Sequence, residues 1–257
     1  MTPRRDALAR LAAQLRRTNY AGRTVSLGEG VAVIGAATLA LLITRRPLDA
    51  LVTGGIGALG LADDLLEQQG EGPATKGLRG HFGALARGRL TTGGAKALGI
   101  PALCLLGAAL APGPRRPLLD AALAAGCANL MNLLDLRPGR ALKAMLPVAA
   151  LLALPVRDDL ERSRSGAVLA RIGGAAALLA LPADLAEHGM LGDAGANTLG
   201  ALTGTALARR APGPVVLASL VVVTGLTLLS ERVSFSAAIE ASPPLRALDR
   251  IGRRGPR

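Results

Sequence analysis

The chain has 257 residues, half of them apolar, and carries a formal net charge of +12 with one Tyr, two Phe and no Trp. A soluble core of this length normally buries aromatic side chains, whereas helices in a bilayer pack through small residues, so the Ala-, Gly- and Leu-rich composition favours a helical membrane protein. The basic residues lie between the apolar runs and at the two ends, without aromatic side chains that could stack on bases. We therefore expect no nucleic-acid partner.

The N-terminal segment, residues 1–27, is basic but lacks the apolar core of a signal peptide. Its first part, MTPRRDALARLAAQLRR, has the pattern of an amphipathic helix. We expect this segment to lie on the cytoplasmic side, near acidic lipid.

Uncharged apolar runs follow between residues 28 and 232 and predict an all-α, polytopic membrane bundle of about eight transmembrane helices. Only the third and the last run approach the ~20 residues that a spanning helix needs, so the others must extend into flanking residues. The runs are Gly30–Thr44, Ala50–Ala62, Ala97–Pro114, Ala121–Leu134, Ala144–Val156, Ile172–Ala183, Ala194–Ala208 and Ala211–Ser230.

The distribution of charge predicts the orientation of this bundle. If both termini are cytoplasmic, the five inside loops hold 19 Lys and Arg residues and the four outside loops hold nine, as the positive-inside rule requires. Residues 28–232 would then form the membrane bundle, and residues 233–257 a basic cytoplasmic tail. We expect a multi-pass protein of the plasma (inner) membrane.

Acidic side chains at the ends of three apolar runs are the first candidates for a functional site. Asp63 and Asp64 end the second run, in LADDLLEQQGEGPATKGL, and a polar loop with Lys76 follows. Two carboxylates in hydrocarbon would cost several kcal/mol, so we expect them at a membrane face or in a wet cavity. In the predicted topology they share the cytoplasmic face with Asp135 and Asp193.

Two further blocks place polar side chains at helical spacing. In NLMNLLDLRPGR, the residues Asn129, Asn132 and Asp135 are three apart and lie within about a third of the helix circumference, so we expect them to face one cavity. In GMLGDAGANTLG, Asp193 and Asn197 are four apart and share a helix face.

Together and in this order, the three blocks resemble the superfamily of polyprenyl-phosphate N-acetylhexosamine-1-phosphate transferases. This superfamily includes the phospho-N-acetylmuramoyl-pentapeptide translocases (glycosyltransferase 4 family), and the present chain resembles a short member. The segments that carry the resemblance are Asp63 and Asp64 with Thr75 to Leu78, the Asn-x-x-Asn-x-x-Asp block from Asn129 to Asp135, and Leu191, Gly192, Asp193 and Gly195.

The resemblance implies a Mg²⁺-dependent phosphoglycosyltransferase of cell-envelope glycan synthesis. Such an enzyme transfers a sugar-1-phosphate from a UDP-N-acetylaminosugar to polyprenyl (undecaprenyl) phosphate at the cytoplasmic face and releases UMP. It implies a magnesium-ligand role for Asp193, and catalytic roles for Asp63, Asp64 and Asp135. It also implies substrate binding by Lys76, Asn129 and Asn132.

The positions of three other polar residues add them to the predicted substrate-binding set. Arg137 and Arg140 lie beyond the membrane end of the fourth run and are placed to hold phosphates, and Asn197 shares the face of Asp193. Lys96, at the start of the third run, is left outside the predicted site.

The chemistry of the residues agrees with this assignment. A pyrophosphate brings about two negative charges, which oxygen-bound Mg²⁺ and a Lys can neutralise. The second pKa of a phosphate monoester is near ~6, so the lipid phosphate is largely dianionic and needs little help from a base. We therefore favour direct displacement with Asp63 or Asp64 as orienter or weak base, and a covalent aspartyl-phosphate route is the alternative.

Other functions are left open by the sequence. Members of this superfamily commonly carry a histidine motif in the last large cytoplasmic loop, and SERVSFSAAIEASPPLRALDRIGR has no His. The alternative is therefore a catalytically inactive relative that binds lipid phosphate or a partner enzyme. A small transporter would place its carboxylates near mid-membrane. Membrane lipids are expected partners in each case, and a homodimer is an option that the sequence does not decide.

Overall fold

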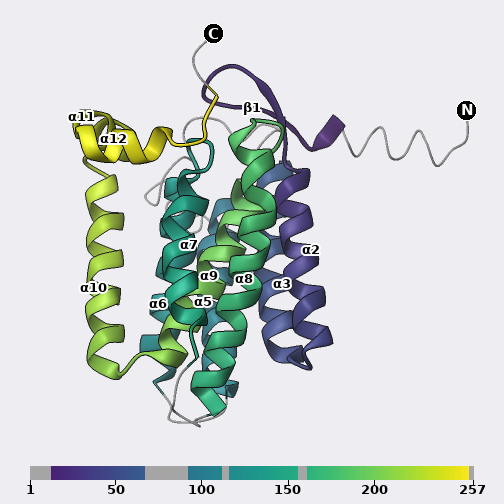
Figure 1. Cartoon of the computed structure of the whole chain (residues 1–257). Helices are drawn as coiled ribbons and strands as arrows, with labels where there is room; N and C mark the ends of the chain where they lie inside the picture. Colours follow the sequence, from purple (N-terminus) through teal and green to yellow (C-terminus); the bar gives the residue numbers. More distant parts are fainter. Residues whose placement is uncertain (1–12, 67–91, 112–115, 156–160, 255–257) are drawn as a thin grey trace, which may run out of the picture.

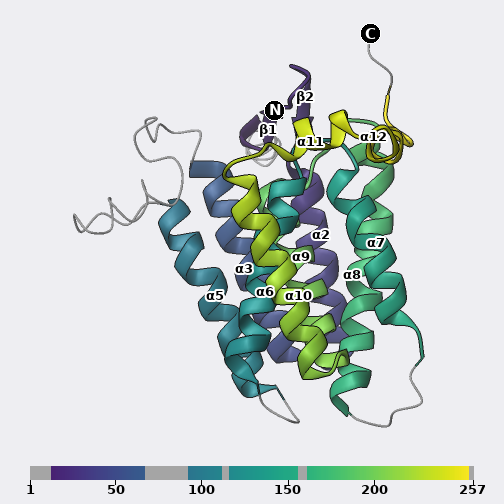
Figure 2. The ribbon, with the colours of Figure 1, turned by 90° about the vertical axis from the view of Figure 1, so that its left-hand side faces the viewer.

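The computed structural model describes residues 13–66, 92–111, 116–155 and 161–254, and within these ranges the protein is nearly all α-helical (Figure 1, Figure 2). Each predicted apolar run corresponds to a helix of its own, and these helices form an upright bundle. They are α2 (Gly28–Ile43), α3 (Pro47–Leu66), α5 (Thr92–Leu110), α6 (Pro117–Leu134), α7 (Arg140–Ala153), α8 (Glu161–Leu185), α9 (Gly192–Arg210) and α10 (Gly213–Ser230).

The bounds of these helices follow from proline and glycine. Pro47 and Pro117 are the first residues of α3 and α6, where the missing N–H group of proline leaves no hydrogen bond unmade. Gly139 precedes α7 and Gly192 begins α9, with φ angles of 69° and 59° that favour glycine. Successive helices of the bundle run in opposite directions, so the end of each lies beside the start of the next (Figure 1).

Within the described ranges, four helices are long and apolar enough to cross a membrane: Gly93–Leu110, Pro117–Leu134, Glu161–Leu185 and Gly213–Ser230. The apolar helix α2 is shorter than these, at 16 residues. The prediction of a helical membrane protein is confirmed at this level. The count of eight crossings and the cytoplasmic location of both termini stay predictions.

The helix α9 forms the centre of the bundle. It packs against α3, α6 and α8, and most of its side chains are buried. Glycines allow the close approach: a Cβ added at Gly60 of α3 would lie 2.7 Å from Ala194 Cα, and one added at Gly204 would lie 2.7 Å from Ala124 Cα of α6. The position of α9 is therefore fixed by backbone contact with two neighbours.

The segment before α2 and the segment after α10 lie, in their described parts, at one end of the bundle (Figure 1). The strands β1 (Arg16–Thr18) and β2 (Thr24–Ser26) form an antiparallel hairpin, and β2 bridges to Gly189 just before α9. The predicted amphipathic helix in residues 1–27 falls mainly outside the described residues. The prediction of a helix is wrong at residues 16 and 17, since Arg16–Thr18 is a strand whose partner is Thr24–Ser26.

Within the predicted basic tail, residues 233–257, the chain forms two short helices, α11 (Phe235–Ala241) and α12 (Pro243–Arg250). The hydroxyl of Ser234 accepts a hydrogen bond from the Ala237 N–H and caps α11. Figure 1 shows both helices lying crosswise at the end of the bundle where α10 ends.

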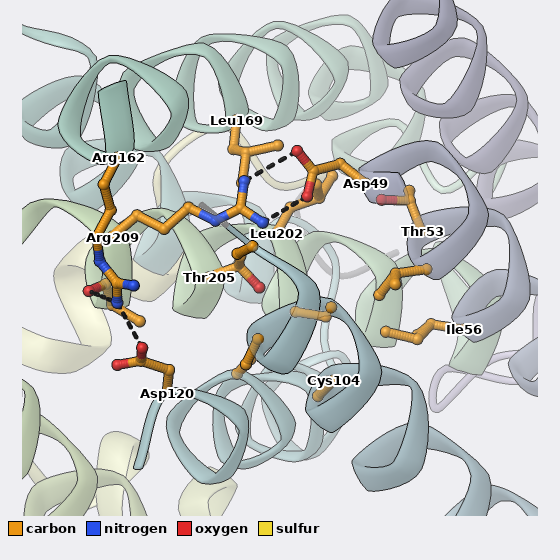
Figure 3. A pocket seen from close by; sticks show the side chains of 17 residues that line it. Asp49, Thr53, Ile56, Cys104, Asp120, Arg162, Leu169, Leu202, Thr205 and Arg209 are labelled. Carbon is orange, nitrogen blue, oxygen red and sulfur yellow. Dashed lines mark hydrogen bonds and ion pairs between the residues drawn. The ribbon is translucent and has the colours of Figure 1, made fainter. Parts of the chain in front are cut away.

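The opposite end of the bundle is held by buried ion pairs (Figure 3). Arg209, in the last turn of α9, binds Asp49 of α3 through two nitrogens at 2.6 and 2.9 Å, and Arg162 of α8 pairs with Asp120 of α6. The pairs border a cavity of about 30 Å³, which has room for about two water molecules. Four helices are thus joined at this end.

We predict that Gly200→Ala destabilises the fold, whereas the same substitution at Gly225 does not. A Cβ at Gly200 would lie 2.7 Å from Ala128 Cα, while at Gly225 it meets no atom within 4 Å. Overpacking costs about 1–3 kcal/mol, and a kcal/mol lowers the Tm of a chain of this size by about 2–4 °C. Thermal unfolding in one detergent measures both variants. Equal Tm values for them would contradict the close contact between α9 and α6.

Candidate functional site

Two carboxylates from other helices hold the N-terminus of α9. Asp64, near the end of α3, accepts hydrogen bonds from the N–H groups of Asp193 (3.2 Å) and Ala194 (3.1 Å). Asp135, directly after α6, accepts one from the Gly192 N–H at 3.0 Å. The first N–H groups of a helix have no partner within it and carry partial positive charge, which both carboxylates satisfy. These contacts fix the place of Asp193 in the first turn.

A lysine lies between the other two aspartates. The Nζ atom of Lys96, in α5, is 2.5 Å from Asp63 Oδ2 and also forms an ion pair with Asp193 Oδ2. All three side chains are largely buried, with 12 to 23% of their surface exposed. One ammonium group thus lies between two carboxylates and reduces the repulsion between them.

The four aspartates that the sequence singles out, Asp63, Asp64, Asp135 and Asp193, therefore meet around the first turn of α9. They come from α3, from α9 and from the turn after α6. Asp64 and Asp135 contact the first residues of α9, and Asp63 shares the Lys96 ammonium with Asp193. Asn197 belongs to the same region, since its Nδ2 donates to the backbone oxygen of Asp193 at 2.7 Å. The catalytic and metal-ligand roles of these residues stay predictions.

Asp135 lies deepest in this group. Burial raises the pKa of its carboxyl well above the ordinary value of 3.8, and the nearby carboxylates of Asp184 and Glu29 raise it further, against the hydrogen bond from Gly192. The sequence analysis did not select Glu29 or Asp184. Asp184 accepts a hydrogen bond from the Gly139 N–H at 3.0 Å, at the turn before α7.

The prediction that Asn129, Asn132 and Asp135 face one cavity does not hold for Asn129. Its Nδ2 is 3.4 Å from Thr227 Oγ1 of α10, and the residue is exposed. A spacing of three falls short of a helical turn by about 60°, so two such steps turn Asn129 by about 120° from Asp135. Asn132 lies between them, and its backbone oxygen accepts from the Asp135 N–H at 3.2 Å.

Arg137 and Arg140 border an open pocket of about 1040 Å³ at the same end of the bundle. The guanidinium of Arg137 stacks on the Tyr20 ring, 3.8 Å from its centroid. Arg140 is 6% exposed and binds Asp249 through two nitrogens, at 2.8 and 3.2 Å. Arg140 therefore anchors α12, whereas the guanidinium of Arg137 lines the pocket.

An apolar groove of about 450 Å³ runs along the bundle between α6, α7, α9 and α10. Leu134, the last residue of α6, lines it and directly precedes Asp135. Ala144 and Met145 line it from α7, one turn beyond Arg140. One end of the groove is therefore close in sequence to Asp135, which follows Leu134, and to Arg140, which is one turn before Ala144.

The donors around Asp193 are of the type that Mg²⁺ takes. Asp63 and Asp193 present carboxylate oxygens to one cation, the Lys96 ammonium, so this place already favours positive charge. Among the residues that the structure describes, no three His, Cys, Asp or Glu side chains are grouped to hold a metal. A magnesium ion would therefore depend on two carboxylates together with water or substrate oxygens.

Two outcomes concern lysines. Lys76 lies outside the described residues. Lys96 was omitted from the predicted site although it is the only charged residue of α5. A single charge in an otherwise apolar helix is a signal of function or pairing that could have identified it.

We predict that Asp64→Ala destabilises the protein more than Asp64→Asn. Alanine leaves the N–H groups of Asp193 and Ala194 without their acceptor, at about 1–3 kcal/mol for each unsatisfied buried group, whereas the Asn oxygen can still accept one of them. Apparent Tm values in detergent should fall in the order wild type, Asp64→Asn, Asp64→Ala. An Ala variant as stable as the wild type would show that this carboxylate does not hold α9.

We also predict a pH-dependent loss of stability through Asp249. Burial by itself would raise the pKa of Asp249, but the hydrogen bonds and charge of Arg140 and the charge of Arg253 lower it below 3.8. A lowered folded-state pKa contributes stability above pH 3.8 that is lost as the pH falls through the folded-state pKa. Asp249→Asn should therefore have a lower Tm than the wild type at pH 7, and the difference should narrow below about pH 4. A difference that is constant with pH would exclude a charged Asp249.

The chain was compared with family models, curated proteins and solved structures, and no match was found. The functional assignment therefore depends on the arrangement of the residues themselves.

Proposed function

We propose that the protein is a Mg²⁺-dependent phosphoglycosyltransferase that transfers a sugar-1-phosphate from a UDP-N-acetylaminosugar to a polyprenyl phosphate and releases UMP. The observation that carries the proposal is the meeting of Asp63, Asp64, Asp135 and Asp193 at the N-terminus of α9. Residues far apart in sequence bring acidic oxygens and an ammonium group to one place, as diphosphate chemistry requires.

The chain's own residues divide this work. Asp64 and Asp135 are engaged with backbone N–H groups, so they position the first turn of α9. Asp193 and Asp63 would hold Mg²⁺, which when bound supplies positive charge to the diphosphate oxygens. Lys96, paired with both carboxylates, would provide a second positive charge for the same oxygens.

The reaction needs one bond to form and one to break. An oxygen of the lipid phosphate attacks the sugar-bearing phosphorus, and the bond from that phosphorus to the bridging oxygen breaks, so UMP leaves with the electron pair. The attacking monoester is largely dianionic at cytoplasmic pH because its second pKa is near ~6. Asp63, which shares the Lys96 ammonium with Asp193, is the residue placed to orient it.

The pockets support two kinds of substrate. The apolar groove that ends at Leu134 suits the chain of a polyprenyl phosphate, with its phosphate toward Asp135. The open pocket beside Arg137 is at the same end of the bundle and suits a soluble, anionic donor. This end would be cytoplasmic, and the membrane would be the plasma (inner) membrane.

One observation favours a second candidate function. The pairing of Lys96 with Asp63 and Asp193 already offsets part of the negative charge of the two carboxylates without a metal. A catalytically inactive relative that binds lipid phosphate or a partner enzyme would keep this pairing as a purely structural contact.

The test is UMP release by the purified full chain with undecaprenyl phosphate, Mg²⁺ and a panel of UDP-N-acetylaminosugars. We expect UMP only when lipid phosphate and Mg²⁺ are both present. Asp193→Asn should lower the rate by about 10²-fold or more, because an electrostatic contact with the reacting groups is lost. Glu231→Gln, an exposed carboxylate after α10, is the matched control and should keep full activity.

Two results separate the candidates. Binding of undecaprenyl phosphate without UMP release from any sugar in the panel would support the inactive relative. Equal rates for Asp193→Asn and wild type would contradict the proposed site.

A further inference from the structure

The helix α12 and the residue after it expose an apolar edge. Leu245 and Leu248 are 49% and 60% exposed, and Ile251 is 60% exposed. The two leucines are three apart and therefore share one side of the helix. Arg246 and Arg250 lie on another side, and Arg250 forms an exposed ion pair with Glu240. The helix is thus amphipathic with its apolar side uncovered by the protein.

The orientation of this apolar side is fixed by polar anchors. Arg140, at the start of α7, binds Asp249 through two nitrogens and Ser236 of α11 at 3.0 Å. Lys143 donates to the backbone oxygens of Asp249 (2.6 Å) and Ile251 (3.0 Å), at the C-terminus of α12 where a cation is favourable. Because these contacts hold α12 against α7, the helix cannot roll to bury its leucines.

The position of α12 identifies what covers it. Figure 1 shows α11 and α12 lying crosswise to α10, directly after the point where α10 ends. The apolar surface of α10 continues toward them through Leu228, Leu229 and Val233, which are 64, 49 and 42% exposed. Because α10 is long and apolar enough to cross a membrane, its apolar surface leads toward the exposed leucines of α12.

The charges beside the apolar edge fit the headgroups of such a lipid layer. The described segment after α10, residues 231–254, carries five Arg residues, two Glu residues and one Asp. That aspartate, Asp249, is bound by Arg140 of α7. Basic side chains next to an amphipathic helix attract anionic lipid, by about 1 kcal/mol for each residue near the surface. A second protein chain would explain the apolar side chains but not this excess of positive charge.

We propose that α11 and α12 form an interfacial element that lies in the headgroup layer and binds anionic lipid. Leu245, Leu248 and Ile251 enter the boundary of the acyl chains, and Arg246 and Arg250 face the phosphates. The proposal does not depend on the transfer reaction.

This contact has a consequence for the neighbouring pocket. Asp249, Arg250 and Arg253 line the open pocket beside Arg137, so one side of that pocket is built on the helix that lies on the membrane. Lipid contact would therefore fix the pocket wall, and the lipid composition would influence what binds there.

The test places nitroxide labels on the full chain in lipid vesicles. In a background where Cys104 and Cys127 are replaced by Ala, Leu248→Cys and Leu245→Cys report on the apolar edge. Arg250→Cys is the matched control on the same helix. Oxygen concentrates in the bilayer and a nickel chelate in water, so the ratio of the two collision rates measures depth. We expect a ratio several-fold higher for both leucine positions than for Arg250→Cys.

Lipid composition tests the charge. Vesicles of phosphatidylcholine with and without phosphatidylglycerol are compared, and the ratio at Leu248→Cys should rise with the anionic lipid. Arg246→Gln combined with Arg250→Gln should remove that rise. A label at Leu248→Cys or Leu245→Cys that collides mainly with the nickel chelate would overturn the proposal. Spin–spin broadening between copies at the same positions would overturn it in favour of a second copy of the chain.

Discussion

The structure depends on the capping of α9 by carboxylates from its neighbours. A helix that begins in the interior of a bundle has N–H groups with neither water nor helical partners, and Asp64 and Asp135 accept from three of them. These hydrogen bonds bring the end of α3 and the end of α6 to the first turn of the central helix. The candidate site is formed by this same contact, because Asp193 is the second residue of α9.

The residue pattern was sufficient to predict much of this arrangement. Each apolar run became a helix, and the acidic residues at the ends of three runs came together because alternating helix directions place those ends side by side. The spacing of Asn129 and Asp135 was less informative, since an offset of six residues turns side chains toward different neighbours. Lys96 was missed because its carboxylate partners are distant in sequence, and the hairpin of Arg16–Thr18 was missed because its second strand bridges to the distant Gly189.

The charges of the chain serve different purposes at the two ends of the bundle. Away from the site, Arg209 pairs with Asp49 and Arg162 pairs with Asp120, so each of these cations has a carboxylate beside the small cavity that they border. At the site end, carboxylates contact backbone N–H groups or share one lysine, and arginines border an open pocket. Both ends of the bundle carry Asp and Arg residues in the sequence. They differ in the partners of the carboxylates, which are arginines at one end and backbone N–H groups or a shared lysine at the other.

The helices α3 and α9 are fastened together at both ends, by Asp49 and Arg209 at one end and by Asp64 at the other. Neither can slide along the other, so Asp63 and Asp193 form a rigid pair of acids. Lys96 belongs to α5, which shares neither fastening and packs mainly against α3 and α6. A small tilt of α5 would carry the ammonium away and leave the acids in place. The charge balance between Asp63 and Asp193 thus depends on the placement of a helix that lies outside the α3–α9 pair.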